Sequence, residues 1–268
     1  MIVRPVLGSA AAIALFLFGV SPVAPHQSTH VNAAPSARVA AAAFDEPELT
    51  QIIAKLDDAL SAPQDPARWA SNAKMAAWNF TRQIQARSLS ADQEASVLKH
   101  LDALGRQYPA VAPAFEQAHR IVSKFTVGKV APEILGKDLE GKTMRLSDYR
   151  GRVVVLAFSG HWCGICRSDY PYDRQLIERY GSASFAFLGV NSDADRNVAR
   201  KAYQDNGLAF RAWWDGPKGG PIATAWEVTG WPTVYVLDPQ GVIRFVDLRQ
   251  EQLLNSVGEL LTEPATAR

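Results

Sequence analysis

The sequence predicts a mixed α/β domain, with a central sheet flanked by helices, preceded by a small all-helical domain. Apolar residues recur at helical spacing across 45–125, whereas short apolar runs alternate with helical segments across 128–263. Strands that alternate with helices are typical of an α/β sheet. The two cysteines of the chain lie three positions apart, where an apolar run gives way to a helical segment.

The first 24 residues have the pattern of an export signal. Arg4 precedes an apolar run from 7 to 20, and prolines and small residues follow it. We expect residues 1–24 to be a signal peptide or, as the alternative, an uncleaved membrane anchor, because the uncharged stretch is nearly long enough to span a bilayer. Either reading implies an exported protein in the periplasm or another extracytoplasmic compartment, soluble or anchored by this segment. Residues 25–44, rich in Pro, Ala, Ser and Thr, are expected to form a flexible linker.

Three or four amphipathic helices are expected in the helical domain, residues 45–125. Leucine and isoleucine recur at helical spacing over 49–60, and the Asp-Pro pair at 65–66 is typical of a helix start. Ser90 and Gln93 have the spacing of a capping box. A last helix contains Phe115, Val122 and Phe125. These apolar stripes predict a self-packed core and indicate no chemistry.

The second half predicts the sheet. We expect strands at 153–159, 185–191, 211–214, 233–237 and 242–247, and helices at 163–180, 195–206 and 250–261. Turn residues at 138–142 predict a hairpin between short strands, and those at 238–241 predict that the last two strands pair antiparallel.

The cysteine pair indicates redox chemistry. Cys163 would begin a helix, where unpaired backbone N–H groups and the helix dipole stabilise a thiolate. Cys166 lies close enough in sequence to form a disulfide with it. A purely structural disulfide is a poor explanation, because a three-residue spacing closes too small a loop to stabilise the fold much. With 28 basic and 27 acidic residues and a net charge of +1, the chain has no charge bias that would indicate a nucleic-acid partner.

The motifs around the pair resemble the thioredoxin superfamily. The resemblance rests on the run 160–166, on Pro171, and on Gly230-Trp231-Pro232-Thr233. The lead-ins at 131–133 and 141–151 narrow it to the exported TlpA/ResA-like (redoxin) thiol-disulfide oxidoreductases. The resemblance covers residues 128–263 and implies a thioredoxin-like redox domain that exchanges disulfides with protein thiols. It implies no bound cofactor or metal, protein thiol or disulfide clients, and an upstream dithiol electron donor or acceptor.

The resemblance also implies residue roles. Cys163 would be the attacking nucleophile and Cys166 the resolving thiol. Six residues would shape the site or bind substrate: Trp162, Gly164, Ile165, Trp231, Pro232 and Thr233. Among them, Pro232 would follow a cis peptide bond and face the sulfurs, and Gly164 would allow a tight turn.

The proton-transfer group is less clearly indicated. Ala157 stands where thioredoxins have a buried aspartate, six residues before the first cysteine. The resemblance points instead to an acid after the next strand, which makes Asp193 and Asp195 candidates for accepting the proton of Cys166. The alternative, that either residue only caps the following helix, stays open.

Three rival functions remain. A peroxiredoxin-like peroxidase would need Pro and Thr where the chain has Leu156 and Gly160. A metal-handling redoxin would bind Cu(I) or Zn(II) through the cysteines and His161, although no histidine follows His161. A binding protein would dock a partner on the helical region without catalytic exchange.

Overall fold

The computed structural model describes residues 43–61, 65–181 and 183–263, all within one compact unit. The expected signal or anchor at 1–24, and the linker up to residue 42, lie outside the described residues. Within the described part of the chain, no helix combines the length and apolar character needed to cross a membrane.

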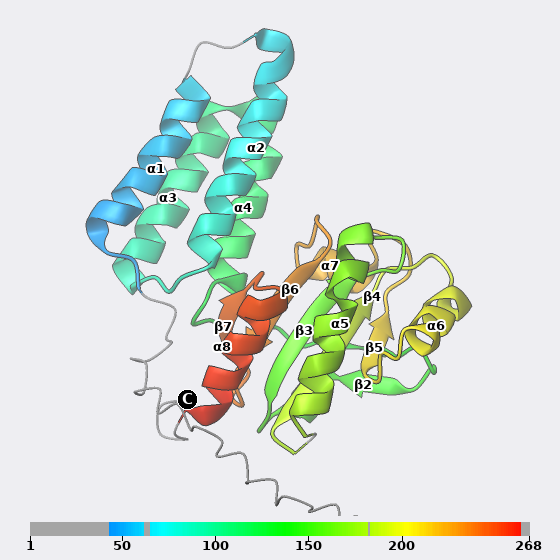
Figure 1. The fold of residues 1–268 in the computed structure, drawn as a ribbon. Coiled ribbons are helices and arrows are strands. Elements are labelled where there is room, and N and C mark those ends of the chain that lie inside the picture. Colours follow the sequence, from blue (N-terminus) through cyan, green and yellow to red (C-terminus); the bar gives the residue numbers. More distant parts are fainter. Residues whose placement is uncertain (1–42, 62–64, 182, 264–268) are drawn as a thin grey trace, which may run out of the picture. The chain divides into compact units, whose positions relative to one another are not determined.

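In the described part of the chain, four helices precede the sheet, and they pack side by side (Figure 1). They are α1 (Glu46–Ser61), α2 (Pro66–Gln85), α3 (Ala91–Gln107) and α4 (Ala112–Phe125), with the short turn η1 (Pro109–Val111) between α3 and α4. Their apolar stripes form one core, which includes Leu56, Ile84, Leu101 and Phe115. Ser90 and Gln93 form the expected capping box at the start of α3. The boundary between a helical domain and a redox domain stays a prediction, because both parts belong to the same compact unit.

The rest of the described chain alternates strands and helices. The elements in order are β1 (Leu135–Lys137), β2 (Thr143–Arg145), η2 (Leu146–Tyr149), β3 (Val153–Ser159), α5 (Gly164–Arg179), β4 (Phe185–Asn191), α6 (Arg196–Asp205), β5 (Arg211–Trp214), α7 (Pro221–Ala225), β6 (Thr233–Leu237), β7 (Ile243–Val246) and α8 (Gln250–Thr262). β1 and β2 form a separate antiparallel hairpin.

The main sheet is mixed, with the strand order β5-β4-β3-β6-β7. β3 pairs parallel with β4 and antiparallel with β6, and β7 pairs antiparallel with β6. Residues 153–158 of β3 are all apolar, in keeping with a strand that is covered on both faces. Val155 packs with Leu176 of α5 and Leu253 of α8, whereas Phe158 packs with Trp226 on the other face. The predicted thioredoxin-like fold, a mixed sheet flanked by helices, is confirmed (Figure 1).

Candidate active site

The cysteine pair lies where β3 passes into α5. Cys163 is the N-cap of α5, and the backbone N–H of Cys166 donates a hydrogen bond to its Sγ at 3.2 Å. The two residues form a disulfide, with Cα atoms 5.2 Å apart. Cys163 is 6% exposed and Cys166 only 2%, so the expected attacking sulfur belongs to the slightly more accessible residue. A sulfur at this position benefits from the positive end of the helix dipole when it becomes a thiolate.

The loop before β6 faces the first sulfur. The Trp231–Pro232 peptide bond is cis, as expected. The carbonyl oxygen of Trp231 lies 3.5 Å from Cys163 Sγ, although the two residues are far apart in sequence. Thr233 Oγ1 donates to the Gly230 carbonyl at 2.9 Å and closes the loop. This arrangement leaves backbone groups of the loop beside the sulfur that a client would approach.

Two tryptophans form an aromatic wall at the site. The rings of Trp162 and Trp231 meet edge to face with centroids 5.7 Å apart. Trp162 Nε1 donates to the Ser192 carbonyl at 3.1 Å, which fixes the indole although the residue remains 41% exposed. Lys218 Nζ lies 3.9 Å from the Trp162 ring centroid, a cation–π contact that no sequence pattern indicated.

The two residues between the cysteines differ in what they contribute. Ile165 is 57% exposed and presents an apolar side chain next to the pair. Gly164 opens α5 without a positive φ, and a Cβ there would have only an ordinary contact, 3.8 Å from Arg167. The tight turn expected of Gly164 therefore does not require glycine. Gly160 is the glycine that close packing does require, because a Cβ there would lie 2.9 Å from Ser192 Oγ and would also meet the Trp162 indole.

The two predicted acids bind backbone N–H groups at different places. Asp193 is buried and accepts hydrogen bonds from the N–H groups of His161 (2.8 Å) and Trp162 (3.4 Å), and also from the Asn191 amide. Asp195 is the N-cap of α6 and accepts from two N–H groups of its first turn. Asp193 therefore stabilises the loop before Cys163, while Asp195 has the capping contacts of the alternative interpretation.

Substitution of Asp193 by alanine should lower the free energy of unfolding by about 1–3 kcal/mol, because the buried Asn191 amide and the partly buried N–H groups of the active-site loop lose their acceptor. Asp195→Ala is the matched control and should cost about 1 kcal/mol through the lost helix cap. Chemical denaturation measures both losses of stability, and the rate of disulfide exchange reports whether the active site still works. We expect slower exchange only in Asp193→Ala; equal exchange rates in both variants would contradict this role for Asp193.

A second acidic pair, which the sequence analysis missed, lies behind Cys166. Asp169 and Asp173 follow Cys166 by three and seven positions on α5, so all three share one helix face. Arg249 donates to Asp169 through Nε (2.8 Å) and Nη2 (2.5 Å). Cys166 and both acids line one cavity of about 20 Å³, which has room for a single water molecule. The spacing along a predicted helix was the sequence signal that could have found these acids.

Asp173 is the less compensated acid of this pair. Burial raises the pKa of its carboxyl well above the ordinary value, and the nearby Asp169 carboxylate raises it further. The guanidinium groups of Arg249 and Arg174 act in the opposite direction. Burial also raises the pKa of Tyr170, in the same cavity, to about 12, so its phenol stays protonated at neutral pH. Asp173 therefore keeps its proton to a higher pH than an ordinary aspartate does.

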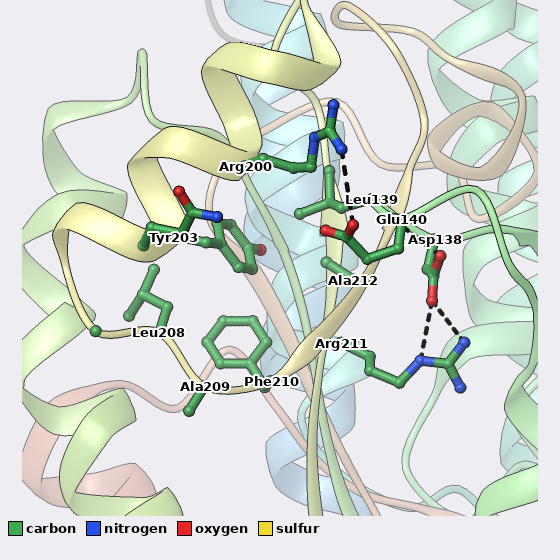
Figure 2. A pocket seen from close by; sticks show the side chains of 12 residues that line it. Asp138, Leu139, Glu140, Arg200, Tyr203, Leu208, Ala209, Phe210, Arg211 and Ala212 are labelled. Carbon is green, nitrogen blue, oxygen red and sulfur yellow. Dashed lines mark hydrogen bonds and ion pairs between the residues drawn. The ribbon is translucent and has the colours of Figure 1, made fainter.

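Figure 2 shows a different hollow, of about 370 Å³, beside α6 and β5. Its charged side chains form ion pairs with one another: Arg211 binds Asp138 at 2.6 Å, and Arg200 lies 3.6 Å from Glu140. Neither cysteine lines it. Among the described residues, no three His, Cys, Asp or Glu side chains come together as a metal site would require.

Comparisons with known proteins place the chain in a family. The AhpC/TSA family matches residues 127–246. Thiol-disulfide oxidoreductase ResA of Bacillus thuringiensis subsp. konkukian is 30% identical over 138 residues, which cover 52% of this chain and 78% of the relative. ResA of Geobacillus thermodenitrificans is 33% identical over 118 residues, which cover 44% of this chain and 67% of the relative. The solved thioredoxin domain of a thiol-disulfide oxidoreductase from Bacteroides vulgatus is 26% identical, with a TM-score of 0.47, and the match covers 51% of this chain and 99% of that domain.

Proposed function

Because this chain belongs to the family of ResA-type thiol-disulfide oxidoreductases, we propose that it exchanges disulfides with protein thiols through Cys163 and Cys166. The observation that carries the proposal is the bonded cysteine pair at the N-terminus of α5, with the Trp231 carbonyl beside its first sulfur. A pair with this geometry can cycle between a dithiol and a disulfide.

The reaction begins with the reduced pair. The thiolate of Cys163 attacks one sulfur of a client disulfide, so that a Cys163–client disulfide forms as the client disulfide breaks. The second client sulfur leaves as a thiolate and takes a proton from solvent. The N–H of Cys166 and the helix dipole favour the attacking anion, and the Trp162–Trp231 wall confines the approach of the client.

Resolution transfers the bond to the second cysteine. Cys166 loses its proton and attacks Cys163 Sγ; the intramolecular disulfide forms, and the other client sulfur leaves reduced. We propose Asp173 as the acceptor of that proton, through one water in the shared cavity, because the raised pKa makes its carboxylate a stronger base than an ordinary aspartate. In the reverse direction, the carboxylic acid returns the proton as Cys166 Sγ leaves, and the client is oxidised.

The family and the N-terminal sequence support an extracytoplasmic setting. Exported clients with thiols or disulfides are the expected substrates, and an upstream dithiol protein supplies or accepts the electron pair. The apolar segment at 7–20 supports export and, if it is not cleaved, attachment to the membrane.

Client trapping tests the proposed function. A Cys166→Ser variant should form the mixed disulfide at Cys163 and fail to resolve it, so clients accumulate as adducts that dithiothreitol releases. Mass spectrometry of the purified full chain identifies them, and the double variant Cys163→Ser/Cys166→Ser is the control. Equal recovery of adducts from both variants would overturn the proposal.

A further inference from the structure

A groove of about 710 Å³ connects the catalytic face with the helices that precede the sheet. Ile165, Trp231 and Pro232 line one side of it, and Lys74, Trp78 and Ile121 line the other. We propose that this groove, here called the client groove, holds an extended client segment with a bulky apolar residue next to its reactive cysteine and an acidic residue farther along. The inference rests on the proposed function, because it names the substrate class of the same site.

The client groove lies beside the cysteine pair, although neither cysteine lines it. Trp231 belongs to it, and the Trp231 carbonyl lies 3.5 Å from Cys163 Sγ. A client cysteine bonded to Cys163 therefore has its flanking residues at the mouth of the groove. A cavity of this volume accommodates several side chains of an extended peptide.

Exposed apolar side chains gather along the client groove. Trp78 of α2 is 48% exposed and Ile165 is 57% exposed, although both are large and apolar. Arg82 covers one face of the Trp78 ring, with its guanidinium carbon 5.3 Å from the centroid. Exposed apolar surface next to a reactive group marks an interaction site, and tryptophan contributes strongly to binding at such sites. These side chains favour a bulky apolar residue in the client.

The charges of the client groove favour an acidic client residue. Its arginines are matched: Arg82 pairs with Asp247, and Arg249 pairs with Asp169. Its carboxylate Glu227 binds Arg120 at 2.6 Å. Lys74 is exposed on α2 and has no ion pair among the described residues of the protein. The charge left over is therefore positive, and an acidic client side chain complements it.

The helical wall of the client groove is held firmly against the sheet. Gln85, at the end of α2, donates to the Tyr235 hydroxyl and to the Phe125 carbonyl, each at 3.0 Å. The Asp247 carboxylate that pairs with Arg82 also accepts the N–H of Val234 at 3.1 Å, in the strand that follows Pro232. A wall fixed before binding lowers the entropy cost of recognition. Because α2 lies outside the residues that match the family, client choice through this wall is a property of this chain.

Two peptide disulfides test the client groove. Each has one cysteine bonded to mercaptoethanol; one peptide carries Phe beside the cysteine and Asp farther along, and the other carries Ser and Lys at those places. Bis(2-hydroxyethyl) disulfide is the reference, and each peptide rate with the reduced full chain is divided by the reference rate of the same variant. We expect the native protein to prefer the Phe/Asp peptide and Trp78→Ala to lower that ratio about fivefold. Lys74→Glu should lower it about threefold at low salt, and about 0.5 M salt should remove this effect.

Met75→Ala is the matched control, because Met75 is also an exposed apolar residue of α2 but faces a different hollow, beside Asn72 and Asn79. Its ratio should equal that of the native protein. The inference is overturned if Trp78→Ala leaves the rate ratio for the Phe/Asp peptide unchanged, or if it lowers the rate ratio equally for both peptides. A native dimer that Trp78→Ala dissociates in sedimentation would assign the groove to a second copy of the chain and also overturn the inference. Failure of the native protein to reduce the reference disulfide would instead refute the proposed function.

Discussion

Replacing Cys163 by serine is expected to lower the rate of disulfide exchange by at least about 10³-fold, because a serine hydroxyl does not ionise at neutral pH and cannot act as the nucleophile. The fold should survive, since serine is nearly isosteric with cysteine and the lost disulfide closes a loop too small to contribute much stability. The rate of reduction of a model disulfide by the pre-reduced chain measures the effect.

Cys166→Ser provides the matched control for this loss. Both variants lack the same disulfide, so differences between them report the roles of the two sulfurs and not the stability of the fold. We expect Cys166→Ser to keep the rapid first attack, seen as one equivalent of leaving thiol, and to lose turnover. A rapid first attack by Cys163→Ser, through Cys166, would show that the two roles are reversed.

The second large effect concerns Asp173. The variant Asp173→Asn should slow the resolution step by about 10- to 100-fold, because an amide cannot accept the proton of Cys166. In the native chain, the resolution rate should rise with pH through the raised pKa of Asp173, and the variant should lose this dependence. Decay of a preformed mixed disulfide, followed between about pH 5 and pH 9, measures both effects.

A control variant at a surface acid distinguishes proton acceptance by Asp173 from the effect of removing one negative charge. Asp205→Asn removes an aspartate that pairs with Lys201 on α6, at 2.8 Å, and should leave resolution unchanged. If Asp173→Asn resolves the mixed disulfide as fast as Asp205→Asn does, Asp173 is not the proton acceptor. If Asp193→Ala, and not Asp173→Asn, abolished the pH dependence of resolution, the role would return to an acid that the sequence analysis named.

Asp173→Asn should also make the protein more stable than the native chain at higher pH. Asp173 ionises in the unfolded chain near its ordinary pKa of 3.8, whereas in the folded chain it keeps its proton to higher pH. Between those two pKa values the folded state binds more protons, so the free energy of unfolding falls as pH rises, by up to about 1.4 kcal/mol per pH unit from this group. Asparagine avoids this loss. The variant should therefore gain stability relative to the native chain as pH rises above about 4, as measured by chemical denaturation.

Most of the fold could be predicted because its signals are local. The run 153–159, apolar up to Ser159, corresponds residue for residue to β3, and the run 185–191, apolar up to Asn191, corresponds to β4 in the same way. The expected helix at 163–180 is α5, which continues through Pro171. Short elements without a periodic pattern, such as α7, were not predicted, because five residues are too few to establish a helical period.

The sequence by itself determined the cysteine pair and the strand-to-helix junction that holds it, because local spacing and apolar runs specify such features. The proline that would face the pair came from the resemblance to the thioredoxin superfamily. Tertiary structure alone decided that the two acids on the face of Cys166 share a closed-in cavity with it, and that Arg249, 80 residues after Asp169, pairs with Asp169. It also decided that α2 presents Trp78 beside the site. The physical reason is that a helix pattern identifies which side chains share a face, whereas the contacts that face makes depend on how distant segments pack.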